Sequence, residues 1–352
     1  MSMISNHHIW LVAIAIIAFL GSLGGVHLFR EYALSRGHID IPNDRSSHET
    51  PTPRGGGIVI AVVVLTVYLA AAAALESNIA IGYLVGATLV VSISWLDDVR
   101  SVAFHWRFLV HTAAAVCLLL DSPTVQHLYI PYSEAVLPLG IFGPLIATVA
   151  IVWMINAYNF MDGIDGIAGA QAVTASVGWL LIAARLDDSL IVFFAMAILA
   201  SSLGFLVHNW PPATIFMGDA GSAFLGFTFA AMPLLVRSHD DIWPGILPWV
   251  TLALVWLFVF DSVVTVLGRL VRREKIWQAH RSHIYQRMVI NGLSHRRVTG
   301  IYFMLSAGIM VTTSYLAIDR RAMEIVTIPA VILSTLVLIV AFLMSKKGVS
   351  SL

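Results

Sequence analysis

Long apolar runs separated by short polar breaks recur along almost the whole chain. A helix of about 20 apolar residues is long enough to cross the ~30 Å hydrocarbon core of a bilayer. We predict a transmembrane helix at each of eleven such runs. They lie at 9–29, 57–75, 79–96, 107–121, 137–155, 167–184, 189–207, 220–236, 246–268, 298–317 and 324–344. The first run follows no basic start and extends past the length of a signal-peptide core, so we expect it to be a retained span.

Composition supports the same interpretation. Apolar residues make up 59% of the 352 residues and charged residues 11%, and the mean hydropathy is +0.86. Soluble domains average about 45–50% apolar and about 25% charged residues. The single cysteine, Cys117, lies within an apolar run, which excludes a disulfide framework and a cysteine metal site. We therefore predict an all-α polytopic membrane protein with one domain, residues 1–352.

The basic residues predict the orientation of the spans. Short loops that face the cytoplasm carry an excess of Lys and Arg. If the 30–56 loop is cytoplasmic, alternate loops place most of the 20 Lys and Arg residues on that side. The opposite side keeps Arg185, Arg237, Arg320 and Arg321. The N-terminus is therefore predicted to be periplasmic and the C-terminus cytoplasmic.

The predicted cytoplasmic loops also carry the polar chemistry. Carboxylates at membrane depth are costly and usually face a cavity or a partner. Several acidic loops on one face predict a divalent cation and a phosphorylated substrate. The loops are DIPNDRSSHETPTPRGGG (40–57), WLDDVRS (95–101), NAYNFMDGIDGIAG (156–169), HNWPPATIFMGDAGS (208–222) and RREKIWQAHRSHIYQR (272–287).

The 156–169 loop has the most specific pattern. Asn156, Asn159, Asp162 and Asp165 recur every third residue, and a glycine follows each aspartate. Residues three apart share a helix face, so we expect Asn156 and Asn159 to lie together. The glycines predict that the helix ends there and that the backbone turns. Amides, carboxylates and backbone N–H groups would then face a nucleotide diphosphate with its metal; the alternative is a polar capping loop.

Acidic groups also stand at two other helix ends. Asp97 and Asp98 end the third run, where they repel each other unless a cation lies between them; the alternative is a solvated helix end paired with Arg100. Asp219 precedes the eighth run and is either a metal ligand or a cap of its own helix. Phe216 either stacks on a base or is a membrane-interface aromatic residue.

The last cytoplasmic loop is basic. His280, Arg281 and His283 predict a phosphate clamp, with the two histidines on one face if the segment is helical. The alternative, positive-inside topology, explains the basic residues at 269–275 but not the histidines. Arg54, in a Pro/Gly loop, is either a phosphate ligand or part of a simple loop.

Asp261 stands apart because it lies well inside the ninth run. An intramembrane carboxylate is by default a candidate for function or for helix pairing. Ser262 and Thr265 are close enough in sequence to satisfy it locally.

Taken together, these motifs resemble the polyprenyl-phosphate N-acetylhexosamine-1-phosphate transferases of glycosyltransferase family 4, relatives of phospho-N-acetylmuramoyl-pentapeptide transferase. The resemblance covers nearly the whole chain. The matching pieces, in family order, are PTPRGGG (51–57), LDD (96–98), N-x-x-N-x-x-D-G (156–163) with DGIAG (165–169), MGDAGS (217–222), FDS (260–262) followed by Arg269, and HRSH (280–283). The muramoyl branch has three consecutive histidines where this chain has HRSH, which favours the branch that initiates surface polysaccharides such as O-antigen.

The resemblance implies a bacterial inner-membrane phosphotransferase with its active site on the cytoplasmic face. It would transfer N-acetylhexosamine-1-phosphate from a UDP-sugar to undecaprenyl phosphate, release UMP and use Mg²⁺ or Mn²⁺. It implies catalytic roles for Asp97, Asp98, Asp162 and Asp219, metal binding by Asp98, Asp162 and Asp219, and substrate binding by Arg54, Asn156, Asn159, Asp165, Phe216, His280, Arg281 and His283. Asp165 would read the uracil. Membrane lipid is an expected partner and nucleic acid is not; a homodimer is left open.

Two rival functions have weaker support in the sequence. A transporter is expected to show inverted repeats and helices broken near the midplane, whereas here the polar groups gather at one face. A CDP-alcohol phosphotransferase would follow Asp-Gly with an Ala-Arg pair, which DGIDGIAG lacks. The identity of the sugar and the choice between a one-step and a covalent two-step route stay open.

Overall fold

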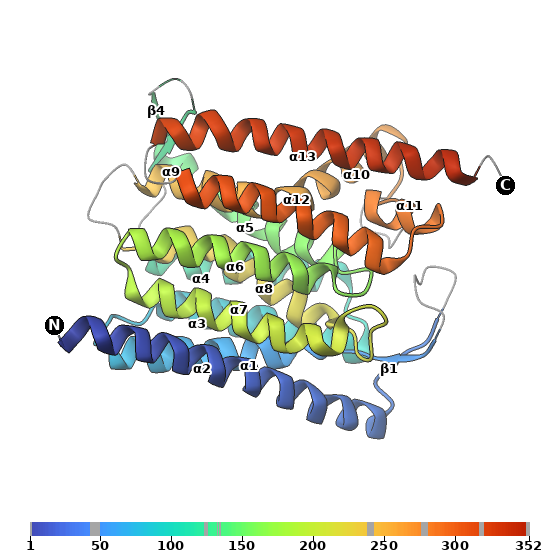
Figure 1. Cartoon of the computed structure of the whole chain (residues 1–352), viewed down its shortest axis with the longest axis horizontal. Coiled ribbons are helices and arrows are strands. Elements are labelled where there is room, and N and C mark those ends of the chain that lie inside the picture. The colour runs from blue at the N-terminus through green and yellow to red at the C-terminus, as the bar shows by residue number, and fades with distance from the viewer. Residues whose placement is uncertain are drawn as a thin grey trace.

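The computed structural model describes residues 2–42, 50–122, 126–131, 133, 135–237, 243–275, 281–316 and 320–349. These residues form an almost entirely helical bundle (Figure 1), as predicted. The helices are α1 Ser2–Arg36, α2 Gly57–Ala74, α3 Ile81–Arg100, α4 Phe104–Asp121, α5 Gly143–Phe160, α6 Ile167–Arg185, α7 Ser189–Asn209, α8 Gly218–Leu235, α9 Trp243–Leu254, α10 Trp256–Val271, α11 Ile284–Ile290, α12 His295–Leu316 and α13 Arg320–Val349, with a short 3₁₀ helix η1 Gly140–Phe142. Two small antiparallel pairs, β1 Ile39–Asp40 with β2 Thr52–Pro53 and β3 His127–Tyr129 with β4 Val136–Pro138, lie in the loops.

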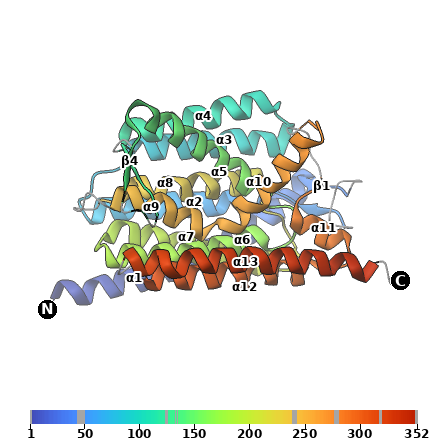
Figure 2. The same cartoon turned by 90° about the horizontal axis from the view of Figure 1, so that it is seen from above.

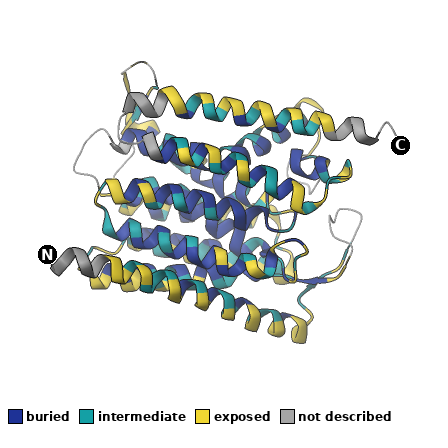
Figure 3. Cartoon of the chain, viewed as in Figure 1, coloured by how far each residue is buried: buried dark blue, intermediate teal, exposed yellow. Residues whose placement is uncertain are grey.

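The long helices lie side by side, and the two ends of the chain lie at opposite ends of the bundle (Figures 1 and 2). Helix α8 is central and contacts α2, α3, α5 and α9. The outer helices α1 and α13 keep exposed apolar faces, whereas α6, α7 and α8 are mostly buried (Figure 3). Apolar faces on the outside of a bundle suit lipid contact. The central helix of the bundle is thus the one that carries Asp219 in its first turn.

The predicted spans can be compared with the helices one by one. Ten of the eleven runs each overlap one α-helix, and the ninth, 246–268, covers both α9 and α10. Seven described helices are long and apolar enough to cross a membrane, or up to eight if one bent pair is a single span. The count of eleven and the orientation of the termini stay predictions. The continuous ninth span at 246–268 is wrong, because α9 and α10 meet at an angle of 80°.

Two glycines set the position of the site-bearing loops. A Cβ atom on Gly57 would lie 2.6 Å from Gly221 Cα, and one on Gly221 would lie 2.5 Å from Gly57 Cα. The first turns of α2 and α8 therefore touch backbone to backbone, as small residues allow in membrane helices. The preceding segments pair as well: Phe216 N donates to Pro53 O at 2.8 Å, and Gly55 N donates to Phe216 O at 3.1 Å. This contact brings the 51–57 loop onto the start of α8.

Candidate active site

Polar side chains from three of the predicted cytoplasmic loops, and one from the start of α4, meet at one end of the bundle. Arg54 places Nε 2.9 Å from Asp98 Oδ1 and Nη2 against Asp219 Oδ1. Arg107, near the start of α4, contacts Asp97 through Nη1, and the same nitrogen lies 3.4 Å from Asp219 Oδ2. We call these five residues the arginine–aspartate cluster. Three carboxylates face two guanidinium groups, so the cluster has one negative charge in excess.

Asp98 is the buried member of this cluster, with its side chain 3% exposed. Its Oδ1 accepts from Asp219 N at 2.9 Å and its Oδ2 from Ala220 N at 3.1 Å. These N–H groups belong to the first turn of α8, which has no partners for them within the helix. Asp98 therefore caps α8 from another helix, a role that we had considered for Asp219. The alternative of a solvated helix end paired with Arg100 is wrong for Asp98.

Arg54 stays charged within this cluster. Burial disfavours the charged guanidinium, but Asp219 and Asp98 outweigh it and raise the pKa of Arg54. Its side chain is nevertheless 35% exposed. An anion that enters the site can therefore reach the guanidinium without disrupting the packed core.

The turn between α5 and α6 forms as the glycine pattern predicts, because α5 ends at Phe160 and α6 begins at Ile167. Asn159 Nδ2 donates to Ser222 Oγ of α8 at 3.1 Å. Asn156 Nδ2 instead donates to the carbonyl of Val152 in its own helix at 2.7 Å. Both asparagines line the same cavity, so they share a helix face as predicted.

Asp162, in this turn, has a carboxyl group whose pKa is strongly raised. Burial, and next the charge of Asp219, raise the pKa of its carboxyl well above the usual value. A neighbouring cation would restore the ionised form. Asn159 and Asp219 are the other oxygen-bearing groups at this point of the site.

The predicted metal ligands Asp98, Asp162 and Asp219 stay a prediction. Within the described ranges, no three His, Cys, Asp or Glu side chains converge as a metal site by themselves. Mg²⁺ usually takes one or two carboxylates and completes its shell with water and substrate phosphates. An ion held by Asp162 and Asp219 would take the place of the arginine side chains that now contact both Asp219 oxygens. Asp98 has both oxygens engaged by N–H groups, so the geometry gives its predicted metal role no support.

Asp165 joins three segments. Its Oδ1 lies 3.3 Å from His295 Nδ1 at the start of α12, and its Oδ2 accepts from Ala213 N at 3.1 Å. Thr299 Oγ1 donates to the Asp165 carbonyl at 2.8 Å. These contacts fix the loop before α8 against the turn before α6. The uracil contact predicted for Asp165 stays a prediction.

Asp261, the intramembrane carboxylate, is fully buried in α10. It accepts hydrogen bonds from His283 Nδ1 at 3.0 Å, Ile284 N at 2.9 Å, Tyr285 N at 3.2 Å, Tyr302 OH at 2.8 Å and Thr265 Oγ1 at 3.1 Å. We call Asp261, Thr265, His283, Tyr285 and Tyr302 the Asp261 cluster. Thr265 is thus the predicted local partner, and the other donors come from the last cytoplasmic loop and α12.

The last loop differs from the predicted helical clamp. α11 begins at Ile284, so His283 is the residue before the helix, and it is 2% exposed. Residues 281–283 are not helical, so the condition for the shared helical face is not met there, and His283 Nδ1 contacts Asp261. His280 lies outside the described residues, and Arg281 is half-buried. Phe216 is half-buried too, with its backbone paired to Arg54; its stacking role stays a prediction.

The sequence pattern alone assigns no chemical role to two residues of the site. The first, Arg107, is a basic residue at the start of an apolar run, ten residues after Asp97. Tyr285 follows the HRSH motif, and its hydroxyl donates to Phe160 O at 2.9 Å. A Cβ atom on Gly163 would overlap this hydroxyl. Tyr285 thereby connects the Asp261 cluster to the Asp162 turn.

A cavity of about 540 Å³ opens onto the arginine–aspartate cluster. Its polar end contains Arg107, Asn159 and Asp219, and the rest runs between α4 and α5 toward α8 and α10. The apolar part of its wall includes Phe104, Phe108, Leu145, Val149, Val152 and Trp153. An occupant with a charged head and an apolar tail matches this distribution.

Comparison with known proteins agrees with the motif resemblance. Residues 80–237 match the family model described as Glycosyl transferase family 4. A probable undecaprenyl-phosphate N-acetylglucosaminyl 1-phosphate transferase of Bacillus subtilis is 27% identical over 86% of this chain and 84% of its own length. The decaprenyl-phosphate N-acetylglucosaminephosphotransferase of Mycobacterium leprae is 29% identical over 76% and 73%. The phospho-N-acetylmuramoyl-pentapeptide-transferase of a Nostoc species is 35% identical over 58% and 59%.

The family match includes the segments that carry Asp97, Asp98, Asp162 and Asp219, all of which lie within residues 80–237. The relatives are named as transferases that act on polyprenyl phosphates, and the described helices include several that are long and apolar enough to cross a membrane. The chain is a multi-span membrane protein, and its residues 80–237 are similar to glycosyl transferase family 4.

Proposed function

We propose that this protein transfers N-acetylhexosamine-1-phosphate from a UDP-sugar to undecaprenyl phosphate and releases UMP, at the cytoplasmic face of a bacterial inner membrane. One observation carries the proposal: an apolar cavity between α4 and α5 ends at Arg107, Asn159 and Asp219. A long apolar chain with a phosphate head has this polarity. The names of the relatives support the same reaction, and the HRSH segment favours an O-antigen-type surface polysaccharide as the product pathway.

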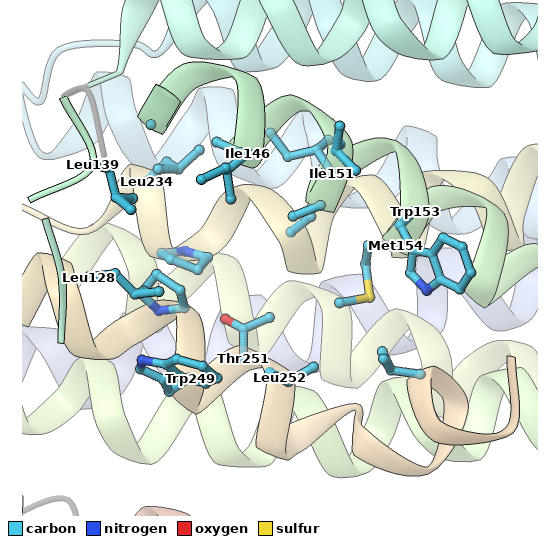
Figure 4. A pocket seen from close by; sticks show the side chains of 18 of the residues that line it. Leu128, Leu139, Ile146, Ile151, Trp153, Met154, Leu234, Trp249, Thr251 and Leu252 are labelled. Atoms are coloured by element: carbon cyan, nitrogen blue, oxygen red, sulfur yellow. The ribbon is translucent and has the colours of Figure 1, made fainter. Parts of the chain in front are cut away.

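The apolar tail has room beyond the first cavity. A second cavity of about 540 Å³ shares Val149 and Trp153 of α5 with the first one. Figure 4 shows side chains of α5, among them Ile146 and Ile151, facing Trp249 and Leu252 of α9 across this space. Its wall is almost entirely apolar. Together the two cavities give an isoprenoid chain a path along α5, from the charged cluster toward the β3–β4 hairpin.

The charged end suits two phosphate groups and a cation. Arg54 and Arg107 are 35% and 30% exposed and can each turn part of their guanidinium toward phosphate oxygens. Asp162 and Asp219, with Asn159, would hold Mg²⁺, or Mn²⁺, which neutralises charge on the donor diphosphate when bound. Asp97 and Asp98 hold Arg107, Arg54 and the start of α8 in place.

The reaction needs positioning more than proton transfer. A phosphate monoester has a second pKa near 6, so the acceptor is mostly dianionic at neutral pH and needs no general base. One acceptor oxygen attacks the phosphorus that carries the sugar, and the bond from that phosphorus to the UMP oxygen breaks, so that UMP leaves with the electron pair. Two anions must approach in line, which the guanidinium groups of Arg54 and Arg107 favour by offsetting their repulsion.

The donor side would use the remaining predicted residues. Asp165 is held by His295 and Ala213 at the edge of the Asp162 turn, where it would read the uracil, with Phe216 as the stacking surface. Arg281, with His280 and His283, would bind phosphate or sugar from the last loop.

The test uses purified full-length protein in detergent with undecaprenyl phosphate and a panel of UDP-N-acetylhexosamines, scored by UMP release. We expect release with one donor in Mg²⁺, loss of release with EDTA, and recovery when Mg²⁺ is restored. Omitting the acceptor gives the background from simple hydrolysis. Failure of every donor, with folded protein, would contradict the proposed reaction, and EDTA-resistant release would contradict the metal.

A further inference from the structure

His111 is a buried imidazole on the wall of the first cavity. It lies on α4 one turn after Arg107, and both residues line the cavity. The side chain is 5% exposed. Among the described residues, neither ring nitrogen has a hydrogen-bond partner. None of the roles discussed above uses this residue.

Three other polar side chains along the same cavity wall are satisfied within their own helices, whereas Trp153 Nε1, a donor only, shares with His111 the lack of a hydrogen-bond partner among the described residues. Thr112 Oγ1 donates to Phe108 O at 2.8 Å, Thr148 Oγ1 donates to Pro144 O at 2.8 Å, and Asn156 Nδ2 donates to Val152 O at 2.7 Å. Each of these side chains is satisfied by a carbonyl of its own helix, which is how polar groups are accommodated in an apolar setting. His111 has no such arrangement, although a neutral imidazole carries one N–H donor and one acceptor.

A buried polar group without a partner lowers stability, because it gives up its hydrogen bonds to water and gains none. The same group strengthens binding if a ligand brings a complementary atom to it, because the group has already lost its water on folding. One helical turn is about 5.4 Å, so His111 lies about that far along α4 from Arg107. This spacing corresponds to the near end of a lipid whose phosphate lies at Arg107.

We propose that His111 is a further binding residue for the lipid acceptor, and that its N–H donates to the acceptor's phosphate, either to a free oxygen or to the ester oxygen that joins the isoprenoid chain. The inference rests on the proposed function and names a contact within that site. Arg107 then binds the phosphate from the polar side, while His111 binds it from the apolar side. The pair selects a phosphorylated lipid over the free alcohol of the same chain length.

The variants needed are His111→Leu, which keeps apolar bulk, and His111→Gln, whose amide N–H can replace the imidazole donor. Ser176→Ala is the matched control, because Ser176 on α6 is also fully buried with no hydrogen-bond partner found in the described chain, but is outside the cavity. Each protein is tested in two ways. Thermal unfolding is measured with no lipid, with undecaprenyl phosphate or with undecaprenol, and steady-state kinetics give separate KM values for acceptor and donor.

We expect undecaprenyl phosphate to stabilise the wild type more than undecaprenol does. His111→Leu should lose this preference and raise the acceptor KM about tenfold, as loss of a hydrogen bond to a charged group predicts, with the donor KM unchanged. His111→Gln should recover most of the affinity, and Ser176→Ala should match the wild type. The lipid-free His111→Leu protein should unfold at the wild-type temperature or above it, because an unsatisfied polar group has been removed.

Two results would overturn the inference while leaving the proposed reaction in place. The first is a His111→Leu protein with wild-type acceptor KM and wild-type preference for the phosphorylated lipid. The second is a variant whose acceptor and donor KM values change together and whose lipid-free unfolding temperature falls, which indicates a packing role. If the wild type releases no UMP with any of the donors and is stabilised by neither lipid, both the reaction and the His111 contact are wrong.

Discussion

Asp219 and Asp261 are both withdrawn from bulk solvent, but their partners differ in kind. Asp219 contacts two arginines and is 18% exposed, at the polar end of a cavity. Asp261 is completely buried and accepts hydrogen bonds from backbone N–H groups, two hydroxyls and one imidazole. The first carboxylate is held by long, flexible charged side chains that a substrate can compete for. The second is held by groups that belong to the framework.

The difference fits the proposed substrate site at Asp219 and a structural role for Asp261. Guanidinium groups that are about one-third exposed can exchange a carboxylate partner for a phosphate at little cost. Both partners are oxyanions that can accept two N–H bonds from the guanidinium group. A carboxylate that ties Ile284 and Tyr285 backbone groups to α10 cannot change partners without releasing the loop. A buried carboxylate with every oxygen satisfied is thus evidence for architecture, even inside a membrane helix.

The largest effect on function is expected at Asp219. Asp219→Asn keeps the shape but removes the charge that balances Arg54 and Arg107 and that would hold the metal. Loss of one electrostatic contact in an active site typically costs about 10²–10³ in rate, so we expect UMP release to fall about 10³-fold while the unfolding temperature stays within a few degrees. Glu31→Gln, at an exposed ion pair with Arg30, is the control and should keep full activity. Near-normal turnover in Asp219→Asn would remove Asp219 from the metal site.

Asp261→Asn should show the opposite order of effects. The amide presents N–H groups to donors that need an acceptor, and breaking a buried network of this kind costs about 3 kcal/mol. We expect the midpoint of denaturant-induced unfolding in detergent to fall accordingly, and limited proteolysis to cut within 281–290 before the rest of the chain.

Asp121→Asn serves as the control for Asp261→Asn. Asp121 accepts a single backbone bond, from Gly82 N at 2.9 Å, so its loss should cost about 1 kcal/mol. If Asp261→Asn keeps wild-type stability and loses turnover alone, Asp261 belongs with Asp219 as a site residue.

The sequence predicted the convergence of the polar loops well, for a physical reason. Helices of similar length in a bundle return alternate loops to the same end, so Arg54, Asp98, Asn159 and Asp219 had to lie at one face once the spans were found. The turn at Asp162 was equally predictable, because glycine after each aspartate is a local signal. The first feature follows from the spacing of the spans along the chain, and the second from residues close together in it.

The features that the sequence did not predict depend on which helices are neighbours. Asp98 caps α8 because α3 packs on α8, and no local pattern in residues 95–101 contains that fact. His283 is held by Asp261, 22 residues earlier, so a periodicity argument within HRSH could not find its partner. The bend between α9 and α10 occurs at Val255, within the stretch 252–260, which is entirely apolar and contains no Gly or Pro.

A double-mutant cycle tests the contact between Tyr285 of the Asp261 cluster and Gly163 of the Asp162 turn. Gly163→Ala should cost about 2 kcal/mol, because its Cβ overlaps the Tyr285 hydroxyl and overpacking is costly. Tyr285→Phe should cost about 1 kcal/mol through the lost bond to Phe160 O. With the hydroxyl gone, the double variant should be more stable than the sum of the two single changes predicts, by about 1 kcal/mol. Strict additivity in unfolding measurements would mean that the hydroxyl does not occupy this position.

The smallest effect is expected at Thr265, and it sharpens the same distinction. Thr265→Val keeps the shape and removes one of the five donors to Asp261, at 3.1 Å. The other four donors remain, so we expect a loss of about 1 kcal/mol in the free energy of unfolding with kcat and both KM values at wild-type levels. Because Asp261 affects the site only through the loop that it anchors, a small loss of stability should leave kcat and both KM values unchanged. A fall in kcat larger than the change in stability would show instead that the Asp261 cluster tunes the active site directly, and the separation between the two carboxylates would fail.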